Sequence, residues 1–332
     1  MVSGAVQVMT VGDADFVEYW VNGELVGESS NGPPFSITWS PNNELFGENK
    51  IYAIAYGDED RVSITPLTIN IPVSAANQNP ISECDDGLHI DDSSIMVCLY
   101  APDKDYVAIK GSWNTEFPNG ELMKLSNNGF WWYSTDLSDG EYSYQFNVDG
   151  EKLIADPWSK DVIWKDIIGL NESADFQRAK TNFSIGGSSY DWGDSDYQRP
   201  IVNELIIYEM HVGDFGPSEN QYGTFEEVTS KIESGYFEQL GINAIELMPV
   251  MEYEGNESWG YNTAFHMAVD KFYGPEEKLK EFIDLCHQNG IAVIFDLVMN
   301  HVMGRSPMNR MWMNDPDGNG WGEPSEESPY FN

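Results

Sequence analysis

The sequence predicts a multidomain chain in which two all-β sandwiches precede the first three βα units of a β/α barrel. Up to about residue 185, short runs of alternating apolar and polar residues are separated by turn residues, which is the period of half-buried strands. After Asn203, apolar strand segments alternate with helical segments. The run 291–301, IAVIFDLVMNH, begins with consecutive apolar residues and therefore predicts a strand buried on both faces of a parallel sheet.

The length of the chain limits the number of domains, and its hydropathy shows whether membrane or signal segments are predicted. The 332 residues are enough for two or three domains, each with its own core. No apolar run is long enough for a transmembrane helix. The start, MVSGAVQVMTV, has no basic region ahead of a long apolar block. The sequence therefore predicts neither a membrane-spanning helix nor a secretory signal.

The charge is strongly acidic, with 17 basic and 55 acidic residues and a formal net charge of −38. Such a surface repels phosphate groups, which argues against nucleic acid or an anionic membrane as partner. Three explanations fit the excess of acids: adaptation to salty surroundings, binding of calcium, and solubility of a secreted protein.

The cysteines do not form a metal-ligand pattern. There are three of them, which is too few for a disulfide framework. Cys286 lies on a helical apolar stripe and is expected to be buried. Cys84 and Cys98 could pair if the compartment is oxidising.

Residues 1–75 are predicted to form the first sandwich. The run 16–21, FVEYWV, leads into Asn22-Gly23, the strongest two-residue hairpin signal, and the run 24–26, ELV, returns. The stretches YWVNGELVG and FSITWSP resemble bacterial immunoglobulin-like modules found on extracellular enzymes. That resemblance implies a spacer or adhesion module. Residues 76–88 are rich in polar and small residues and are predicted to be a linker.

Residues 89–185 are predicted to form the second sandwich, with strands at 95–101, 106–111, 129–135 and 141–148. Its many aromatic side chains could stack on sugar rings or could fill the core. The stretches GSWN, NGFWWYSTDL, GEYSYQFNVDG and ADPWS resemble the early-set, glycogen-binding-type sandwich that precedes the barrel in branching enzymes, isoamylases and many amylase relatives.

Residues 186–332 are predicted to contain three parallel strands, at 205–208, 244–250 and from 291. A capping box of Thr224 and Glu227 starts the first helix, and Gly241 ends it. The second helix begins at Pro275 and ends at Gly290. The apolar face of the first helix recurs at helical spacing through Phe225, Val228, Ile232, Tyr236 and Leu240. Short connections between these elements predict right-handed crossovers.

Polar side chains follow all three predicted strands. Because the carboxyl ends of parallel strands lie on one side of a sheet, these side chains are expected to converge at the mouth of a β/α barrel. An acid, an amide and an imidazole in such a place could bind a polyhydroxylated ligand or a hard cation, or could be ordinary loop polarity. The residues are His211, Asp214, Glu252, Trp259, Tyr261, Asp296, Asn300 and His301.

The stretches IIYEMHVGDF, GTFEEV, YFEQLGINAIELMPV, SWGYNTAFHMAVDKFYG and IAVIFDLVMNH, in this order, resemble the opening third of the (β/α)8 TIM barrel of glycoside hydrolase family 13, the α-amylase family. DLVMNH matches the signature D-x-V-x-N-H of that family. The resemblance implies that Asp296 supports the catalytic centre, that Asn300 is a ligand of a structural calcium ion, and that His301 binds the sugar where the bond breaks.

The same resemblance implies further sugar contacts. Tyr261, in SWGYN, matches the tyrosine that stacks under the same sugar. Trp259 occupies a position where many amylases have histidine, and His211 follows the first strand on the same side. These residues complete the predicted substrate site, whose partner is an α-glucan polysaccharide or oligosaccharide.

The resemblance places the two catalytic carboxylates on strands four and five, and the chain ends at Asn332 after the third strand. Retaining glycosidases need a nucleophile and an acid roughly 5 Å apart. We therefore expect the N-terminal part of a retaining α-glucan hydrolase or transglycosylase, inactive as an isolated chain. The alternative is a non-catalytic glucan-binding or surface-anchoring protein. By analogy with other modular enzymes, its location is expected to be secreted, periplasmic or on the cell surface.

A second calcium motif is predicted near the end of the chain. Asp315, Asp317, Asn319 and Glu326 fit the loop D-x-[DN]-x-[DN]-G-x5-E, whose alternating oxygen ligands suit a hard cation. Pro324 interrupts this pattern and no helix clearly follows. The predicted cofactor is thus Ca²⁺ in a structural role.

Overall fold

The computed structural model describes fifteen stretches of the chain, and they include most of each predicted domain. No helix within these stretches is long and apolar enough to cross a membrane. The described residues are 6–10, 14–39, 47–57, 61–63, 66–71, 78–80, 84–115, 119–150, 152–163, 179–187, 189–193, 196–217, 222–255, 258–315 and 322–331.

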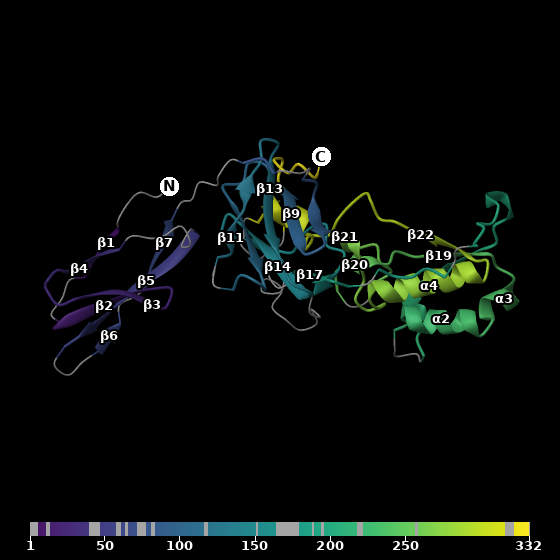
Figure 1. Cartoon of the computed structure of the whole chain (residues 1–332), viewed down its shortest axis with the longest axis horizontal. Helices are drawn as coiled ribbons and strands as arrows, with labels where there is room; N and C mark the ends of the chain where they lie inside the picture. Colours follow the sequence, from purple (N-terminus) through teal and green to yellow (C-terminus); the bar gives the residue numbers. More distant parts are fainter. Residues whose placement is uncertain are drawn as a thin grey trace.

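The first unit is a sandwich of two antiparallel sheets (Figure 1). Its strands are β1 (Val6–Thr10), β2 (Phe16–Val21), β3 (Glu24–Ser29), β4 (Phe35–Trp39), β5 (Gly47–Tyr56), β6 (Arg61–Ser63) and β7 (Leu67–Ile71). One sheet pairs β1 with β4; the other has the order β3-β2-β5-β6, and β7 also pairs with β5. Val17 and Tyr19 of β2 pack with Phe35 of β4 to form the core between the sheets.

The hairpin predicted between β2 and β3 is confirmed. Asn22 and Gly23 both have positive φ, of 49° and 94°. Two consecutive left-handed residues are the geometry of the tight two-residue turn that matches the twist of the strands. The Asn22 side chain adds a hydrogen bond to Asn49 at 2.7 Å, which ties the turn to β5.

The second unit is also built from two antiparallel sheets, of order β11-β10-β14-β17-β16 and β12-β13-β9-β8. Its strands are β8 (Gly87–Asp91), β9 (Ser94–Tyr100), β10 (Val107–Gly111), β11 (Glu121–Leu122), β12 (Lys124–Leu125), β13 (Phe130–Asp136), β14 (Gly140–Val148), β15 (Lys152–Ile154), β16 (Val162–Ile163) and β17 (Lys180–Ile185). The four predicted strands are confirmed as β9, β10, β13 and β14. Trp131, Tyr144 and Phe146 are buried in the core between the sheets.

The described part of the predicted linker lies against the second unit. Gln78 donates its backbone N–H to Leu125 and accepts a hydrogen bond from the Trp132 indole at 2.6 Å. Cys84 and Cys98 form a disulfide, which confirms the predicted pairing. The sequence did not predict the two Gln78 contacts or β8, because this stretch carries too few apolar residues to show a strand pattern.

The third unit has a parallel sheet of order β18-β19-β22, with helices packed on one face. Its elements are two 3-10 helices (Val202–Glu204 and Val212–Phe215), β18 (Ile207–Met210), α2 (Phe225–Glu233), α3 (Tyr236–Leu240), β19 (Ala244–Leu247), β20 (Met251–Tyr253), β21 (Thr263–Val269), α4 (Glu276–Gln288) and β22 (Ala292–Phe295). The capping box of Thr224 and Glu227 at the start of α2 is confirmed. Phe225, Phe282 and Leu247 belong to the core between helices and sheet.

The first predicted helix is wrong in its second half. Gly235 adopts a left-handed conformation with φ of 72° and divides the segment into α2 and α3. The break rotates the second part of the segment, so that Phe237 is buried while Tyr236 and Leu240, predicted on the apolar face, are 39% and 48% exposed.

The prediction that β22 is buried on both faces is also wrong in this chain. β22 is the last strand of its sheet, and Phe295 at its end is 38% exposed. At the opposite edge, Ile207 of β18 is 48% exposed. Both edge strands, β18 and β22, therefore expose apolar side chains. In a closed barrel, a neighbouring strand would cover each of them.

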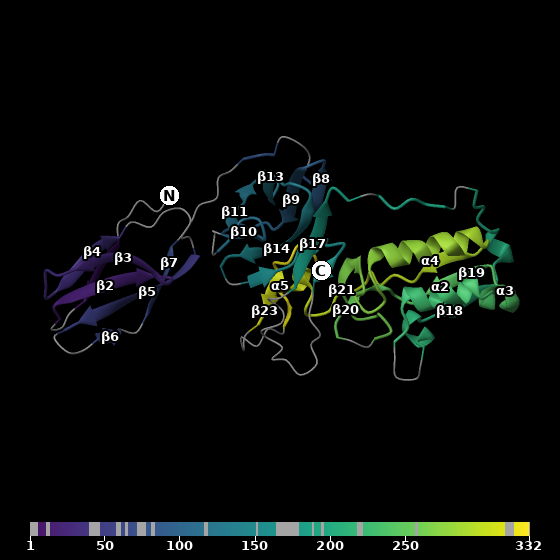
Figure 2. The same cartoon turned by 60° about the horizontal axis from the view of Figure 1, so that its bottom comes forward.

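The segment after β22 returns to the second unit, and Figures 1 and 2 both show the C-terminus beside it. This segment contains α5 (Pro307–Met311), β23 (Met313–Asn314) and β24 (Glu323–Pro324). Trp312 is buried in the core of the second unit. Lys104 donates to the carbonyl of Met311 at 2.6 Å, and its ammonium lies 4.5 Å from the Trp312 ring centre. The Tyr330 hydroxyl donates to the carbonyl of Tyr100 at 2.8 Å.

We predict that Trp312→Ala destabilises the protein by about 3–5 kcal/mol, because it empties a large buried site and removes the cation–π contact with Lys104. Urea unfolding followed by circular dichroism measures the change. Trp192→Ala is the matched control, because Trp192 is 43% exposed and its loss should change the stability by less than about 0.5 kcal/mol. Equal stability of the two variants would contradict the packing described above.

Two buried carboxylates, one on β20 and one directly after β21, lie near the same lysine ammonium group. The Lys271 ammonium lies 2.5 Å from Glu252 and 3.8 Å from Asp270, whose side chains are 1% and 0% exposed. Burial and the adjacent Asp270 carboxylate raise the pKa of Glu252 to about 7. Burial also raises the pKa of Asp270. Because one ammonium cannot neutralise two buried anions, the folded state holds a proton here more tightly than the unfolded state does.

A raised acid pKa in the folded state makes stability fall as pH rises. We predict that the contribution of Glu252 and Asp270 to the free energy of unfolding decreases between pH 5 and pH 7 and is constant above that range. Glu252→Gln should make this decrease shallower. Urea midpoints across pH 5–8 measure it. Glu281→Gln, at an exposed position, serves as control for the change in net charge. Identical slopes for Glu252→Gln and Glu281→Gln would show that the buried pair does not titrate in this range.

Candidate functional site

The candidate site lies at the carboxyl ends of the three parallel strands. The Tyr261 hydroxyl, from the loop before β21, donates to Asp296 at 2.7 Å, and Asp296 directly follows β22. The backbone N–H of Asp296 bonds to Leu247 of β19, which continues the sheet pairing by one residue and fixes where this carboxylate leaves the sheet. Tyr261 is 41% exposed, so part of its ring remains open to a ligand.

The loop after β22 carries the other predicted residues and is held against β21. His301 Nε2 lies 2.7 Å from the carbonyl of Tyr261, so this nitrogen carries the proton and donates. The backbone N–H of Met303 donates to Thr263 of β21. His301 Nδ1 lies 3.1 Å from the side-chain oxygen of Asn300. Tyr261, Asp296, Asn300 and His301 are therefore brought together as a connected group.

His266, on β21, was not predicted as a site residue. Its imidazole interacts with the backbone of Val298 and His301, and burial lowers its pKa. It therefore acts as a positioning residue for the loop that carries Asn300 and His301. The signal in the sequence was an isolated histidine in an apolar strand, which does not distinguish a packed side chain from a functional one.

Glu209 and Glu246 were also missed. They occupy paired positions on β18 and β19, on the sheet face opposite the helices. The hydrogen bond to Asp296 raises the pKa of Tyr261 to about 12, and the charges of Glu209 and Glu246 act in the same direction. Tyr208 and Ile245 directly precede them in the two strands and face the helices. Because successive side chains of a strand point to opposite faces, Glu209 and Glu246 point away from the helices.

Other predicted residues lie around this group in different environments. Trp259, two residues before Tyr261, is 69% exposed. His211 is buried: its Nε2 lies 2.9 Å from both the Tyr273 hydroxyl and the Ser258 carbonyl. It therefore holds the loop before Trp259 in place. Asp214 lies 3.2 Å from His211 Nδ1.

The two predicted calcium sites differ in how many of their residues are described. The side-chain oxygen of Asn300 lies 3.1 Å from His301 Nδ1. In the described stretches, no group of three or more acidic, histidine or cysteine side chains is arranged to hold a metal ion. Asp317 and Asn319 lie outside the described residues, whereas Asp315 and Glu326 flank the gap. Calcium at Asn300 and calcium at the Asp315 motif therefore both stay predictions.

The arrangement has the groups needed to bind a polyhydroxylated ring. Tyr261 offers an aromatic face, and Asp296 offers carboxylate lone pairs that the tyrosine leaves free. The His301 ring is oriented by the hydrogen bond from its Nε2 to the Tyr261 carbonyl, which lowers the entropy lost when a ligand is bound. Stacking on one side with acceptors on the other is the combination that sugar rings require, because they have apolar C–H faces and hydroxyl donors.

We predict that loss of the hydrogen bond between Tyr261 and Asp296 changes the titration of the Tyr261 hydroxyl. Asp296→Asn should lower the pKa of Tyr261 from about 12 towards its ordinary value of about 10, because it removes both the hydrogen bond and the charge. Carbon-13 NMR of labelled tyrosine, assigned with Tyr261→Phe, measures the change. Glu326→Gln is the control, because Glu326 does not contribute to the Tyr261 shift. An unchanged pKa in Asp296→Asn would refute the contact.

Three comparisons with known proteins agree on one family. The family described as Alpha amylase, catalytic domain matches residues 188–316. Malto-oligosyltrehalose trehalohydrolase of Arthrobacter ramosus is 32% identical over 186 residues, 55% of this chain and 29% of that protein. The 1,4-alpha-glucan branching enzyme GlgB of Geobacillus stearothermophilus is 30% identical over 231 residues, 65% and 34% of the two chains. The chain thus spans about a third of the length of these relatives.

Solved structures show the same fold. A structure titled as a putative alpha amylase from Salmonella typhimurium superimposes with a TM-score of 0.58 at 23% identity, over 73% of this chain and 38% of that one. The pullulanase SAP of Group B Streptococcus, solved with maltotetraose, gives a TM-score of 0.54 at 21% identity over 94% of this chain and 46% of that one. Residues 188–316 of this chain are similar to the catalytic domain of the α-amylase family.

Proposed function

We propose that this chain is the α-glucan-binding N-terminal part of a retaining glycoside hydrolase or transglycosylase that acts on starch, glycogen or maltooligosaccharides. The observation that carries the proposal is the connected group of Tyr261, Asp296 and His301. These side chains combine one partly open aromatic face with fixed polar groups, and they stand at the positions of the family signature. The relatives named above support an α-glucan as ligand, since their names refer to malto-oligosyltrehalose and 1,4-alpha-glucan.

The two sandwiches complete the proposal as an immunoglobulin-like module and an early-set module ahead of the barrel. Their two-sheet architecture and the stretches quoted for each module support this assignment. The packing of Trp312 in the second unit supports a role for the early-set module as a scaffold of the barrel. The Cys84–Cys98 disulfide supports a secreted, periplasmic or cell-surface location, because disulfides persist in oxidising compartments.

The 332 residues alone are proposed to bind glucan without cleaving it. The residues matched to the family support substrate binding, and none of them is a nucleophile or a general acid. A carboxylate nucleophile and a carboxylic acid are both needed for a retaining mechanism through a covalent glycosyl intermediate. A non-catalytic glucan-binding protein with the same modules would share the binding property, so catalysis must be tested separately from binding.

We expect the full chain to bind maltotetraose in isothermal titration calorimetry, and Tyr261→Ala to weaken that binding about 5- to 30-fold, which corresponds to about 1–2 kcal/mol of lost stacking and hydrogen bonding. Trp192→Ala, which changes an aromatic residue outside the site, should leave the affinity unchanged.

The same samples test catalysis by an assay for reducing sugar released from soluble starch. No release is expected. Release of maltooligosaccharides by the wild type would overturn the proposal that the chain alone is non-catalytic. Absence of maltotetraose binding by folded chain would overturn the glucan site itself.

A further inference from the structure

The outer face of the larger sheet in the first unit carries two pairs of aromatic side chains that lie outside its core. Buried residues of β2 alternate with partly exposed ones, which point to the opposite face of the sheet. On that outer face Trp20 lies opposite Tyr52 of β5, and Phe16 lies opposite Tyr56. We call these four rings the aromatic face. All four are partly exposed and therefore accessible to a ligand.

The two rings of each pair are nearly parallel. The angle between the planes of Trp20 and Tyr52 is 6°, and their ring centres are 6.2 Å apart. For Phe16 and Tyr56 the angle is 7° and the distance is 4.5 Å. Because Phe16 and Trp20 are four residues apart on one strand, about 13 Å of sheet separates the pairs. A linear ligand of several rings can therefore contact both pairs, whereas a single small ring can contact only one.

Glu18 lies on the same face of β2, between the two pairs, and connects them. Its Oε2 accepts hydrogen bonds from the Trp20 indole at 3.1 Å and from the Tyr56 hydroxyl at 2.8 Å. These two bonds orient one ring of each pair and hold the carboxylate in place. Within the described residues only Oε2 of this carboxylate accepts a hydrogen bond. Its Oε1 is therefore open to a hydroxyl group of a ligand.

We propose that the aromatic face binds a neutral polysaccharide, whose pyranose rings stack on the two aromatic pairs and whose hydroxyl groups donate to Glu18. This inference does not depend on the candidate site at Tyr261. Figures 1 and 2 both show the first unit at the opposite end of the molecule from β19 and β22. The proposal gives the first unit a ligand class, which its resemblance to immunoglobulin-like modules does not supply.

The chemistry of the aromatic face favours a neutral sugar chain over a charged one. The apolar C–H face of a pyranose ring matches an aromatic ring, and its hydroxyl groups match a carboxylate acceptor. Glu28 of β3 lies opposite Glu18 and is exposed. With two carboxylates on this face and a net charge of −38, a polyanionic chain would be repelled.

A second copy of this chain fits the aromatic face less well than a sugar chain does. Leu25 of β3 lies opposite Trp20 and is 46% exposed, so it extends the apolar part of the surface. Pairing of two such faces would nevertheless bring Glu18 and Glu28 of one copy towards the same carboxylates of the other. Like charges brought together at an interface oppose association. A neutral ligand does not meet this repulsion.

Affinity gel electrophoresis of the full chain tests the inference in a Tyr261→Ala background, which weakens the candidate site. The gels contain soluble starch, which is α-linked, or hydroxyethylcellulose, which is β-linked. We expect retardation by at least one polymer, relative to a gel without polysaccharide, and the polymer identifies the linkage. Trp20→Ala and Tyr52→Ala should each lower the apparent affinity about tenfold, because each removes one ring of a pair. Met9→Ala, which changes a 61% exposed apolar residue on the other sheet of this unit, should leave it unchanged.

Glu18→Gln makes the test independent of removing a large side chain. It keeps the shape of the side chain and should still weaken binding, because a neutral amide is a poorer acceptor than a carboxylate. Circular dichroism checks that each variant is folded.

Three results would overturn the inference. The first is unretarded migration of folded Tyr261→Ala protein in both gels, and the second is unchanged retardation in Trp20→Ala and Tyr52→Ala. The third is a dimer in sedimentation velocity that Trp20→Ala dissociates, because a second copy would then cover the aromatic face. None of these results affects the proposed function, which is tested by maltotetraose binding at Tyr261.

Discussion

The loop after β22 depends on β21 for its hydrogen bonds, and the candidate site depends on that loop. A loop without regular structure must satisfy its backbone and polar side chains elsewhere. Here the partners are the Thr263 carbonyl, which accepts from Met303, and the Tyr261 carbonyl, which accepts from His301. The same residues that anchor the loop also form the site, so the shape of the site follows from backbone satisfaction rather than from flexible side chains.

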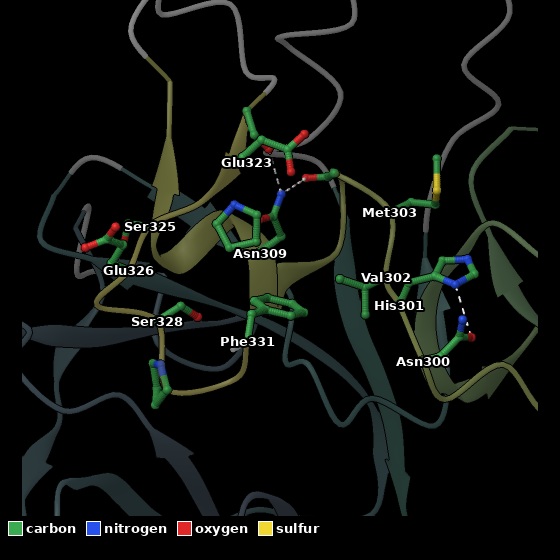
Figure 3. A pocket seen from close by; sticks show the side chains of 14 residues that line it. Asn300, His301, Val302, Met303, Asn309, Glu323, Ser325, Glu326, Ser328 and Phe331 are labelled. Atoms are coloured by element: carbon green, nitrogen blue, oxygen red, sulfur yellow. Dashed lines mark hydrogen bonds between the residues drawn. The ribbon is translucent and has the colours of Figure 1, made fainter.

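The second unit supports the C-terminal end of the segment that follows β22. Trp312 is buried in the core of that unit, and Tyr330 donates to its backbone. The segment between His301 and Phe331 is thus held at both ends, by β21 and by the second unit. The described residues 301–315 and 322–331 line a pocket of about 1190 Å³ (Figure 3), and these contacts tie its walls to packed cores.

The elements that the sequence predicted well are those with strong local signals. The Asn22-Gly23 turn, the Thr224 and Glu227 capping box and the start of α4 after Pro275 depend on residues close in sequence. The predictions that were wrong depend on distant contacts. Tyr236 was assigned to an apolar face because a regular helical period was extended through Gly235, whose left-handed backbone changes the phase. The burial of Phe295 was overestimated because a strand's neighbours cannot be read from its own residues.

Spacing and composition were enough to predict the alternation of strands and helices after Asn203, the signature around Asp296 and His301, and an acidic surface that argues against polyanionic partners. These properties are written in spacing and composition, which need no knowledge of the fold. The fold was needed to find that His211 is buried against Tyr273, that His266 contacts the backbone of the loop, and that Phe331 and Asn309 line a pocket with Asn300. The reason is physical: burial and hydrogen-bond satisfaction depend on which residues become neighbours, and here these neighbours come from elements separated by tens of residues.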